Sequence, residues 1–290
     1  MALEFQKEII IFLQSLRNVV TEFFFNFVSF FGEPEFYILL LGLIYWVLNK
    51  KAGEVIGVTL GLSLSLNNIF KAIFQIERPH ITYDEIDNLR ASTATGSSFP
   101  SGHTQGAASL FFALALAFKK RFLMIIAVVM TILMMLSRVF LGVHYLQDVL
   151  AGALIGFLLA LMVHKIFQKY HNQPLVLHKI YGLMIALMLP AVLLVDVNDF
   201  FRGYGIFVGL ILAVVIEKRY VNFTLVISWQ RKVLRYLIGV ILLMISMTVL
   251  GLLFGLAPEN LKNGLDFIRF FLVALIGFGL YPMFFTKFKF

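Results

Sequence analysis

Apolar runs of about 20 residues recur along the whole chain, separated by short polar segments. Each run is long enough to cross a bilayer as an α-helix, because a helix rises about 1.5 Å per residue and the hydrocarbon core is about 30 Å thick. The pattern predicts an all-α, polytopic membrane helix bundle of about ten helices. We expect them at roughly 3–31, 35–49, 54–77, 101–118, 121–140, 144–166, 178–195, 203–217, 233–256 and 265–286, with a polar segment at roughly 78–99.

The first expected helix is amphipathic in its first half, where Gln6, Lys7, Gln14 and Arg17 interrupt the apolar run. Two placements therefore stay open: the helix spans the bilayer at a tilt, or it lies partly in the interface. The early charges also argue against a cleavable signal peptide.

Composition excludes a soluble domain, because 60% of the residues are hydrophobic and only 14% are charged. Mean hydropathy is +0.91. The chain has no cysteine, which excludes disulfides, thiolate metal sites and a cysteine nucleophile. The net charge of +8 is better explained by membrane topology than by nucleic-acid binding, because the basic residues cluster in particular loops.

The loops sort by charge. Basic loops contain Lys50, Lys51, Lys119, Lys120, Arg121, Lys165, Lys169, Lys218, Arg219, Arg231, Lys232, Arg235, Lys287 and Lys289. Acidic loops contain Glu33, Glu35, Asp84, Glu85, Asp87, Asp196, Asp199 and Glu259. Because Lys and Arg mark the cytoplasmic side, ten spans predict two cytoplasmic termini and an extracytoplasmic acidic face, in a plasma membrane of bacterial type.

The first of three polar patches contains Lys71 and Arg78, followed by Pro79. The seven-residue spacing is two helical turns, so both cations share a face if the third helix continues to Arg78. Two cations on one face repel each other unless an anion lies between them. The alternative is that these side chains snorkel to the interface.

The second patch is Pro100-Ser101-Gly102-His103, directly before a long apolar run. Proline and serine favour a helix start, and a helix N-terminus with free N–H groups binds anions. Ser101 adds a hydroxyl donor, Gly102 allows close backbone approach, and His103 stands at the opening of this site. The alternative is a capping or interfacial histidine.

The third patch contains Ser137, Arg138, His144 and Asp148. His144 and Asp148 are four residues apart and share a face if both are helical. Asp148 then accepts the Nδ1 proton of His144 and leaves Nε2 as the nucleophile. The planar guanidinium of Arg138 fits two phosphate oxygens. The alternative is a structural Arg–Asp pair.

Together the patches contain the groups that phosphoryl transfer needs: cations to neutralise the phosphate, a nucleophile, and an acid for the leaving oxygen. The nearby acidic residues form no carboxylate cluster that would hold Mg²⁺. We therefore expect no metal and no cofactor, with three cations in place of the ion.

These motifs, including Pro79, Pro100 and Ser137, resemble the signature of the type 2 phosphatidic acid phosphatase superfamily over roughly 35–166. The resemblance implies that His144 forms a phosphohistidine, with Asp148 as its catalytic partner. It further implies that His103 protonates the leaving alkoxide and that the phosphate is bound by Lys71, Arg78, Ser101, Gly102 and Arg138.

Usual members have about six spans, so residues 1–170 are expected to form the phosphatase core and 171–290 a four-helix C-terminal extension, both within one integrated membrane domain. The longer layout is similar to sphingosine-1-phosphate phosphatases and related bacterial proteins. The polar segment 196–202 either contacts a headgroup or simply caps a helix.

The expected function is a membrane lipid phosphatase acting at the extracytoplasmic face. Its candidate substrates are polyprenyl diphosphate, phosphatidate, phosphatidylglycerol phosphate and long-chain-base phosphate. The alternatives are a lipid-phosphate transporter and a phosphotransferase that use the same site. The sequence predicts no nucleic-acid partner and leaves the oligomeric state open.

Overall fold

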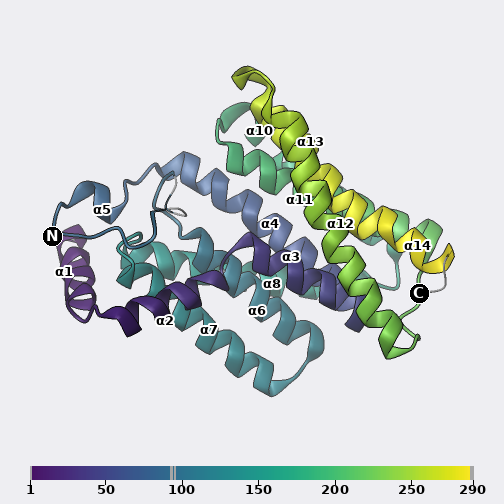
Figure 1. Cartoon of the computed structure of the whole chain (residues 1–290), viewed down its shortest axis with the longest axis horizontal. Coiled ribbons are helices and arrows are strands. Elements are labelled where there is room, and N and C mark those ends of the chain that lie inside the picture. The colour runs from purple at the N-terminus through teal and green to yellow at the C-terminus, as the bar shows by residue number, and fades with distance from the viewer. Residues whose placement is uncertain (1, 92–93, 95, 288–290) are drawn as a thin grey trace. The chain divides into compact units, whose positions relative to one another are not determined.

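The computed structural model describes residues 2–91, 94 and 96–287, and every regular element in that part of the chain is helical (Figure 1). The first eight helices are α1 (Ala2–Ser15), α2 (Val19–Phe30), α3 (Pro34–Leu43), α4 (Lys50–Phe74), α5 (Pro79–Thr82), α6 (Gly102–Phe118), α7 (Arg121–Phe140) and α8 (Leu146–Tyr170). The remaining six are α9 (Pro174–Met188), α10 (Ala191–Leu194), α11 (Asn198–Ile216), α12 (Trp229–Gly255), α13 (Lys262–Leu275) and α14 (Tyr281–Lys287). The predicted all-α fold is confirmed.

Short segments of other helix types join some of these elements. The π-helices η1 (Ile44–Leu48), η3 (Glu217–Val221) and η5 (Ile276–Leu280) continue α3, α11 and α13, and the 3₁₀ turn η4 (Glu259–Leu261) precedes α13. Residues 92, 93 and 95 of the predicted polar segment lie outside the described residues.

Within the described residues, seven helical stretches are long and apolar enough to cross a membrane. An eighth crossing results if α2 and α3 with η1, which are bent by 53°, form one broken span. α6 has 17 residues, so at 1.5 Å per residue it reaches about 25 Å, slightly less than a typical hydrocarbon core. The count therefore falls below the predicted ten mainly because of the N-terminal segment.

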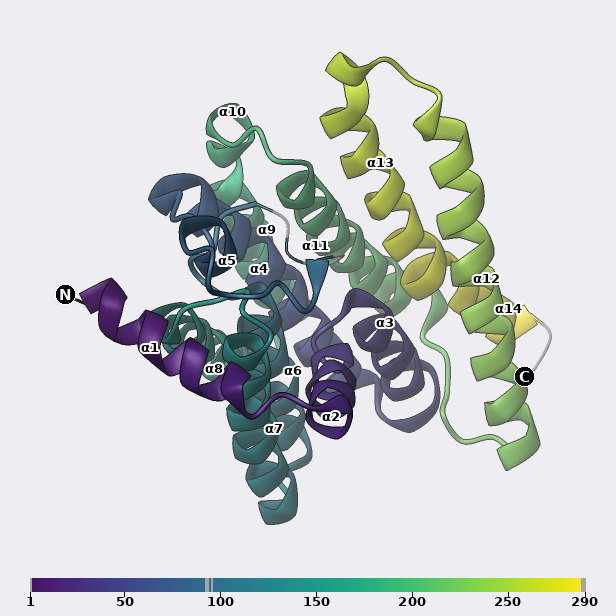
Figure 2. The same cartoon turned by 60° about the vertical axis from the view of Figure 1, so that its left-hand side comes forward.

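The single helix predicted at 3–31 is wrong, because the chain breaks at Asn18 into α1 and α2 (Figure 2). The Asn18 side chain accepts hydrogen bonds from the backbone N–H groups of Val20 and Thr21, at 2.9 and 3.0 Å. The Thr21 hydroxyl in turn accepts from the Asn18 N–H at 2.9 Å. This reciprocal capping box starts a new helix at a point where hydropathy alone shows no break.

α1 lies against the loop that follows α5. Lys7 pairs with Glu85 at 2.7 Å and Arg17 pairs with Asp87 at 2.9 Å. The amide of Gln14 also donates to the backbone oxygen of Asp87 at 2.8 Å. These contacts hold α1 against the acidic loop that follows α5.

α4 ends earlier than predicted. It stops at Phe74, Gln75 adopts a left-handed φ of 47°, and Arg78 is the N-cap of the short helix α5, with Pro79 in its first turn. The third helix does not continue to Arg78, so the condition under which Lys71 and Arg78 would share one helix face is not met. A residue with a left-handed φ commonly ends a helix, so α4 stops just before Gln75 and does not reach Pro79.

The chain forms two compact units. Unit 1 comprises Met1–Tyr37 and Leu66–Leu161, and unit 2 comprises Ile38–Ser65 and Met162–Phe290. In unit 1, α6, α7 and α8 run side by side (Figure 2). A Cβ atom on Gly152 of α8 would lie 2.7 Å from the carbonyl oxygen of Ser101. The missing side chain therefore lets the start of α8 approach the start of α6.

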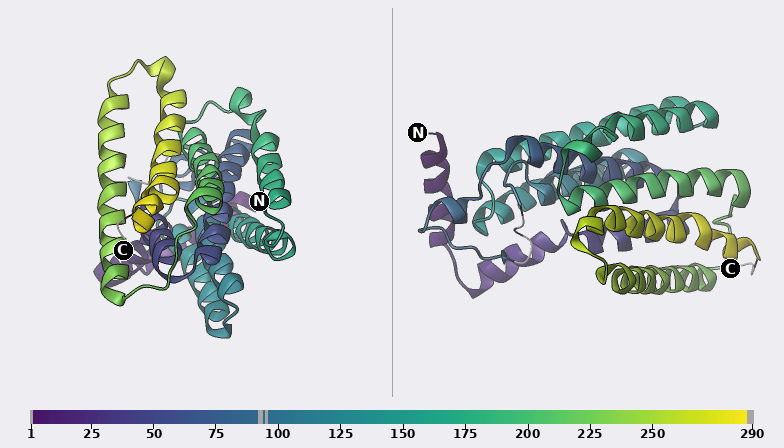
Figure 3. Two further views of the ribbon diagram at one scale, coloured as in Figure 1. Left: turned by 90° about the vertical axis from the view of Figure 1, so that its right-hand side faces the viewer. Right: turned by 90° about the horizontal axis from the view of Figure 1, so that it is seen from above.

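In unit 2, α12 and α13 form an antiparallel pair joined by η4 (Figure 3). α11 packs closely on α13, with Gly205 and Gly209 facing the backbone of that helix. Two nearly buried carboxylates are neutralised by lysines, since Glu54 pairs with Lys218 at 2.7 Å and Glu217 pairs with Lys50 at 2.7 Å. Both of these carboxylates are thus paired, as intramembrane charges usually are.

Candidate active site

The N-terminus of α6 is tied to the first turn of α8. Ser101 is the N-cap of α6, and its Oγ accepts from the Thr104 N–H at 3.4 Å. The backbone N–H of Ser101 donates to the carbonyl oxygen of Asp148 at 3.0 Å. The second and third sequence patches, which include Gly102 next to Ser101, therefore meet at one place in unit 1.

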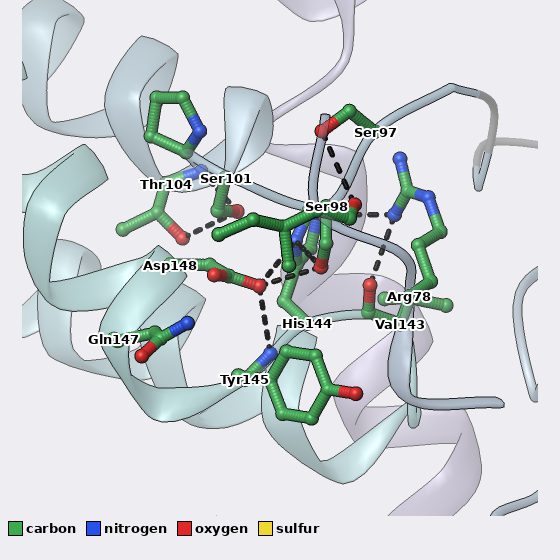
Figure 4. Close-up of polar contacts among 12 residues, drawn as sticks. Arg78, Ser97, Ser98, Ser101, Thr104, Val143, His144, Tyr145, Gln147 and Asp148 are labelled. Atoms are coloured by element: carbon green, nitrogen blue, oxygen red, sulfur yellow. Dashed lines mark hydrogen bonds and ion pairs between the residues drawn. The ribbon is translucent and has the colours of Figure 1, made fainter. Parts of the chain in front are cut away.

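His144 lies just before α8, which begins at Leu146, so the predicted shared helix face with Asp148 is wrong in form. The two side chains are nevertheless close, with His144 Nδ1 at 3.5 Å from Asp148 Oδ2 (Figure 4). Ser98 fills the gap. Its hydroxyl donates to Asp148 Oδ2 at 2.5 Å, and its oxygen lies 3.4 Å from His144 Nδ1.

Arg78 fixes the tautomer of His144. Its Nη1 lies 3.3 Å from His144 Nε2 and donates to the carbonyl oxygen of Val143 at 2.9 Å, while its Nε donates to the carbonyl oxygen of Gly96 at 2.9 Å. A guanidinium only donates hydrogen bonds, so Nε2 must be the acceptor and Nδ1 must carry the ring proton. The lone pair of His144 therefore points toward a cation.

Arg138 is fully buried near the end of α7. Its Nη1 donates to the Ser29 hydroxyl at 2.6 Å, and the adjacent Ser137 hydroxyl donates to the carbonyl oxygen of Phe25 at 2.8 Å. Both bonds attach α7 to α2. Ser137 thus lies in the helix packing, whereas Arg138 brings a positive charge toward the histidines.

The electrostatics of His144 follow from burial and from three cations. Burial has the largest effect, and the charges of Arg78, Arg138 and Lys71 add to it, so the pKa of His144 lies well below its ordinary value. The imidazole is therefore neutral near pH 7 and keeps its lone pair. Lys71, whose helix does not reach Arg78, is still close enough to act on this ring.

His103 occupies the first turn of α6. Its Nε2 is buried and has no hydrogen-bond partner in the described part of the chain. Arg138, Lys71, Arg90 and Arg78 all act on it electrostatically. The cations around this buried imidazole repel each other. An anion bound beside His103 would offset that repulsion, so the surroundings of His103 favour anion binding.

Sequence reasoning gave no role to Ser98, although its hydroxyl contacts both His144 and Asp148. Ser98 is fully buried and lies in the loop before α6. No periodic pattern indicates which way a loop side chain points, so only its position three residues before Ser101 could have suggested it. Arg90 was missed for the same reason.

Among the described residues, no three His, Asp or Glu side chains gather in a way that could hold a metal ion. Apart from Asp148, the side chains named above around His144 and His103 are hydroxyls and cations. The arrangement can therefore bind a tetrahedral oxyanion beside a neutral imidazole.

Comparison with known proteins gives two family matches. Residues 54–172 match the PAP2 superfamily, and residues 201–290 match the PAP2 superfamily phosphatase, transmembrane extension. A probable sphingosine-1-phosphate phosphatase from Dictyostelium discoideum is 29% identical over 53% of this chain, but the match covers only 41% of that protein. The chain thus spans about two fifths of that relative's length.

Two bacterial proteins are covered more fully. The bacitracin transport permease protein BcrC of Bacillus licheniformis is 33% identical, over 47% of this chain and 68% of that protein. The crystal structure of a transmembrane PAP2 type phosphatidylglycerolphosphate phosphatase from Bacillus subtilis matches with a TM-score of 0.51 and 25% identity, over 58% of this chain and 87% of that one. With three ordered motifs meeting at one site and these matches, the chain belongs to the PAP2 superfamily.

Proposed function

We propose that this integral membrane protein is a lipid phosphatase that hydrolyses a lipid phosphomonoester or diphosphate through a phosphohistidine. The observation that carries the proposal is the contact of His144 with Arg78 on one ring nitrogen and with Ser98 and Asp148 on the other. An imidazole oriented in this way carries its lone pair on Nε2, beside the Arg78 guanidinium that would hold a phosphate, and it can attack phosphorus once the phosphate takes over the hydrogen bond of Arg78. Relatives named as phosphatases of sphingosine-1-phosphate and phosphatidylglycerolphosphate support the reaction class.

The cations and the N-terminus of α6 bind the phosphate. Arg78 and Arg138 are buried, and with Lys71 they supply three positive charges around His144. Buried cations at this density repel each other, and a phosphate dianion offsets that repulsion. Ser101 and Gly102, at the N-terminus of α6, add hydrogen-bond donors to the phosphate oxygens.

In the first step, the Nε2 lone pair of His144 attacks phosphorus and forms an N–P bond. The bond from phosphorus to the leaving oxygen breaks, and its electron pair stays on that oxygen, which takes a proton from His103. The bound phosphate favours the protonated form of His103. Asp148, helped by Ser98, stabilises the positive charge that develops on the ring of His144.

In the second step, His103 removes a proton from water as the water oxygen attacks the phosphorus. The N–P bond breaks, its electron pair returns to Nε2 of His144, and inorganic phosphate leaves. His103 regains in the second step the proton that it gave up in the first, so both histidines return to their starting states.

We further propose that the site faces the extracytoplasmic side, because the acidic loop of unit 1, with Asp84, Glu85 and Asp87, follows the short helix that Arg78 caps, whereas Lys119, Lys120 and Arg121 lie at the opposite ends of α6 and α7. The contacts of α1 with Glu85 and Asp87 support placing α1 on that same side. This differs from the predicted cytoplasmic position of both termini and follows from the break at Asn18. The C-terminal end stays cytoplasmic in this proposal, in a plasma membrane of bacterial type.

The predicted division near residue 170 also stays a proposal. Residues 1–170 would carry the chemistry and 171–290 would shape the membrane surroundings of the lipid tail. All of the site side chains named above lie before residue 170, the first family match ends at residue 172, and the second begins at residue 201.

A lipid-phosphate transporter is the second candidate, and the name of the bacitracin transport permease relative favours it. Transport needs recognition of the phosphate but no nucleophile. Release of inorganic phosphate by purified protein, in the absence of any gradient, separates the two functions.

The test is phosphate release by the full chain in detergent, across phosphatidate, phosphatidylglycerol phosphate, a long-chain-base phosphate and a polyprenyl diphosphate. We expect at least one to be hydrolysed and His144→Ala to abolish the release. No release from any of the four by folded protein would contradict the proposal.

A further inference from the structure

Three buried polar atoms around His103 lack a hydrogen-bond partner among the residues that the structure describes. They are Oη of Tyr37 in α3, Nε of Arg90 in the loop after α5, and Nε2 of His103 itself. The Tyr37 side chain is only 4% exposed. Other buried atoms without a partner are scattered over the described chain, but these three lie beside the candidate active site, where a bound ligand would supply the missing bonds.

Close packing brings the three side chains together. The Tyr37 hydroxyl lies against Gly106, which is three residues after His103 on α6, and a Cβ atom there would overlap it. A Cβ atom on Gly32, in the turn between α2 and α3, would lie 2.9 Å from Cδ2 of His103. The next residue, Glu33, forms an ion pair with Arg90.

Arg90 is held in place from two sides. Besides Glu33, its Nη1 donates to the Asn26 side-chain oxygen at 2.8 Å, which leaves Nε directed elsewhere. Arg90 acts electrostatically on both His103 and Arg138. It is thus a fourth cation at the site, beyond the three that the proposed function assigns to the phosphate under attack.

The hydrogen-bonding groups that lack a partner indicate the chemistry of the ligand. The Tyr37 hydroxyl and the Arg90 Nε–H are both donors, and the carboxylate of Glu33 is already occupied by Arg90. A leaving group with a plain alkyl chain offers nothing to these donors. A leaving group with anionic oxygens next to the scissile bond satisfies both.

We infer that Tyr37 and Arg90 form a second anion subsite beside His103, which binds the leaving phosphoryl group of a lipid diphosphate. The inference rests on the proposed function, because that function makes His103 the acid at the leaving oxygen. It deepens that function by assigning a substrate class, the lipid diphosphates.

In the reaction this implies, His144 Nε2 forms a bond with the terminal phosphorus. The bond from that phosphorus to the bridging oxygen breaks, and the bridging oxygen keeps the electron pair and takes the proton of His103. The lipid monophosphate that leaves is held by Tyr37 and Arg90. Water then hydrolyses the phosphohistidine, so the net products are the lipid monophosphate and inorganic phosphate.

The direct test is binding of inorganic pyrophosphate and of phosphate to the purified His144→Ala protein by calorimetry. We expect pyrophosphate to bind roughly tenfold or more tightly than phosphate. Tyr37→Phe should remove most of that difference and leave phosphate binding unchanged. Because the Tyr37 hydroxyl makes no hydrogen bond to any residue that the structure describes, this change breaks none of those bonds and the fold should be retained.

Tyr45→Phe is the matched control, because Tyr45 is also buried with an unpartnered hydroxyl but belongs to unit 2. It should leave both affinities unchanged. Equal binding of pyrophosphate and phosphate, or an equal effect of Tyr37→Phe and Tyr45→Phe, would overturn the subsite.

A second arm compares hydrolysis of farnesyl diphosphate and farnesyl monophosphate in detergent micelles by the protein with His144 intact. We expect kcat/KM to be higher for the diphosphate, and we expect Arg90→Gln to lower that preference roughly tenfold or more. Arg17→Gln is the control. It removes an exposed ion pair with Asp87 of the same loop and should leave the preference unchanged. A monophosphate rate equal to the diphosphate rate overturns the subsite and leaves the phosphatase proposal standing. Failure to release phosphate from any lipid contradicts the phosphatase, while the calorimetry still decides the subsite.

Discussion

The hydroxyl of Ser98 donates to Oδ2 of Asp148 at 2.5 Å, closer than either group lies to the His144 ring. The Tyr145 N–H donates to the same carboxylate oxygen at 2.9 Å. Asp148 Oδ2 is thus fixed by two donors, and the carboxylate acts on His144 partly through the serine (Figure 4). Ser98 is a positioning residue. Removing its hydroxyl should weaken the orientation of the His144 ring and leave the cations that bind the phosphate unchanged.

Ser98→Ala is expected to lower kcat roughly tenfold or more with little change in KM, because one hydrogen bond to a charged group is lost. Ser98→Thr should recover part of the rate, since it keeps the hydroxyl. Ser97→Ala is the control, because the Ser97 hydroxyl donates to the backbone oxygen of Ile76, at 3.1 Å, and not to Asp148. Initial rates of phosphate release over a range of lipid concentrations measure both constants. Equal losses in the two alanine variants would contradict the role of Ser98.

The pH dependence of kcat/KM follows from the electrostatics of His144. Burial and the nearby cations hold its pKa well below the ordinary value, which is about 6.5. The nucleophile must be neutral, and a neutral form is present above the pKa. Protonation of His144 should therefore place the acidic limb of the profile below pH 6.5, whereas the alkaline limb reports the loss of the proton of His103. An acidic limb centred at or above 6.5 would contradict this assignment.

Hydropathy and motif spacing were sufficient to predict the helical fold and to identify the groups that gather at the site. His144, Asp148 and Arg78 do make contact, although neither predicted helix face exists. The reason is local backbone geometry. Gln75 turns left-handed before Arg78, and Gly142, with a φ of 72°, turns the chain before His144. Such turns leave no periodic signal in the sequence.

The break at Asn18 escaped prediction for a related reason. A capping box depends on two side chains and their backbone geometry, whereas hydropathy averages over a whole turn of helix or more. The roles of Ser98, Tyr37 and Arg90 were also out of reach of the sequence, because they depend on which loop atoms face the histidines.

Gly32 is predicted to control the position of His103. A methyl group there would lie 2.9 Å from Cδ2 of His103 and from Cε of Met134, so the imidazole must move. Because displacing a catalytic group by about 1 Å costs up to about 10²-fold, Gly32→Ala should lower kcat strongly. Gly182→Ala is the matched control, since no atom lies within 4 Å of its added Cβ. Wild-type turnover by Gly32→Ala would contradict the role given to His103.

Cysteine labelling can test on which side of the membrane α1 lies. The chain contains no cysteine, so the unsubstituted protein gives no background labelling. Glu8, Asp84 and Lys119 are all exposed. Glu8→Cys and Asp84→Cys should react with an impermeant maleimide added to intact cells, whereas Lys119→Cys should react only after permeabilisation. Labelling of Glu8→Cys together with Lys119→Cys, rather than with Asp84→Cys, would show that α1 lies on the other side.

The covalent step at His144 is the central claim. The direct measurement is a rapid quench in base of protein mixed with a lipid phosphate labelled on the phosphorus, followed by peptide mapping, because a phosphohistidine survives base and is lost in acid. The account predicts label on the peptide containing His144, discharge of that label by water as phosphate, and no label in His144→Ala. Label on another residue, or phosphate release by His144→Ala at the wild-type rate, would contradict it.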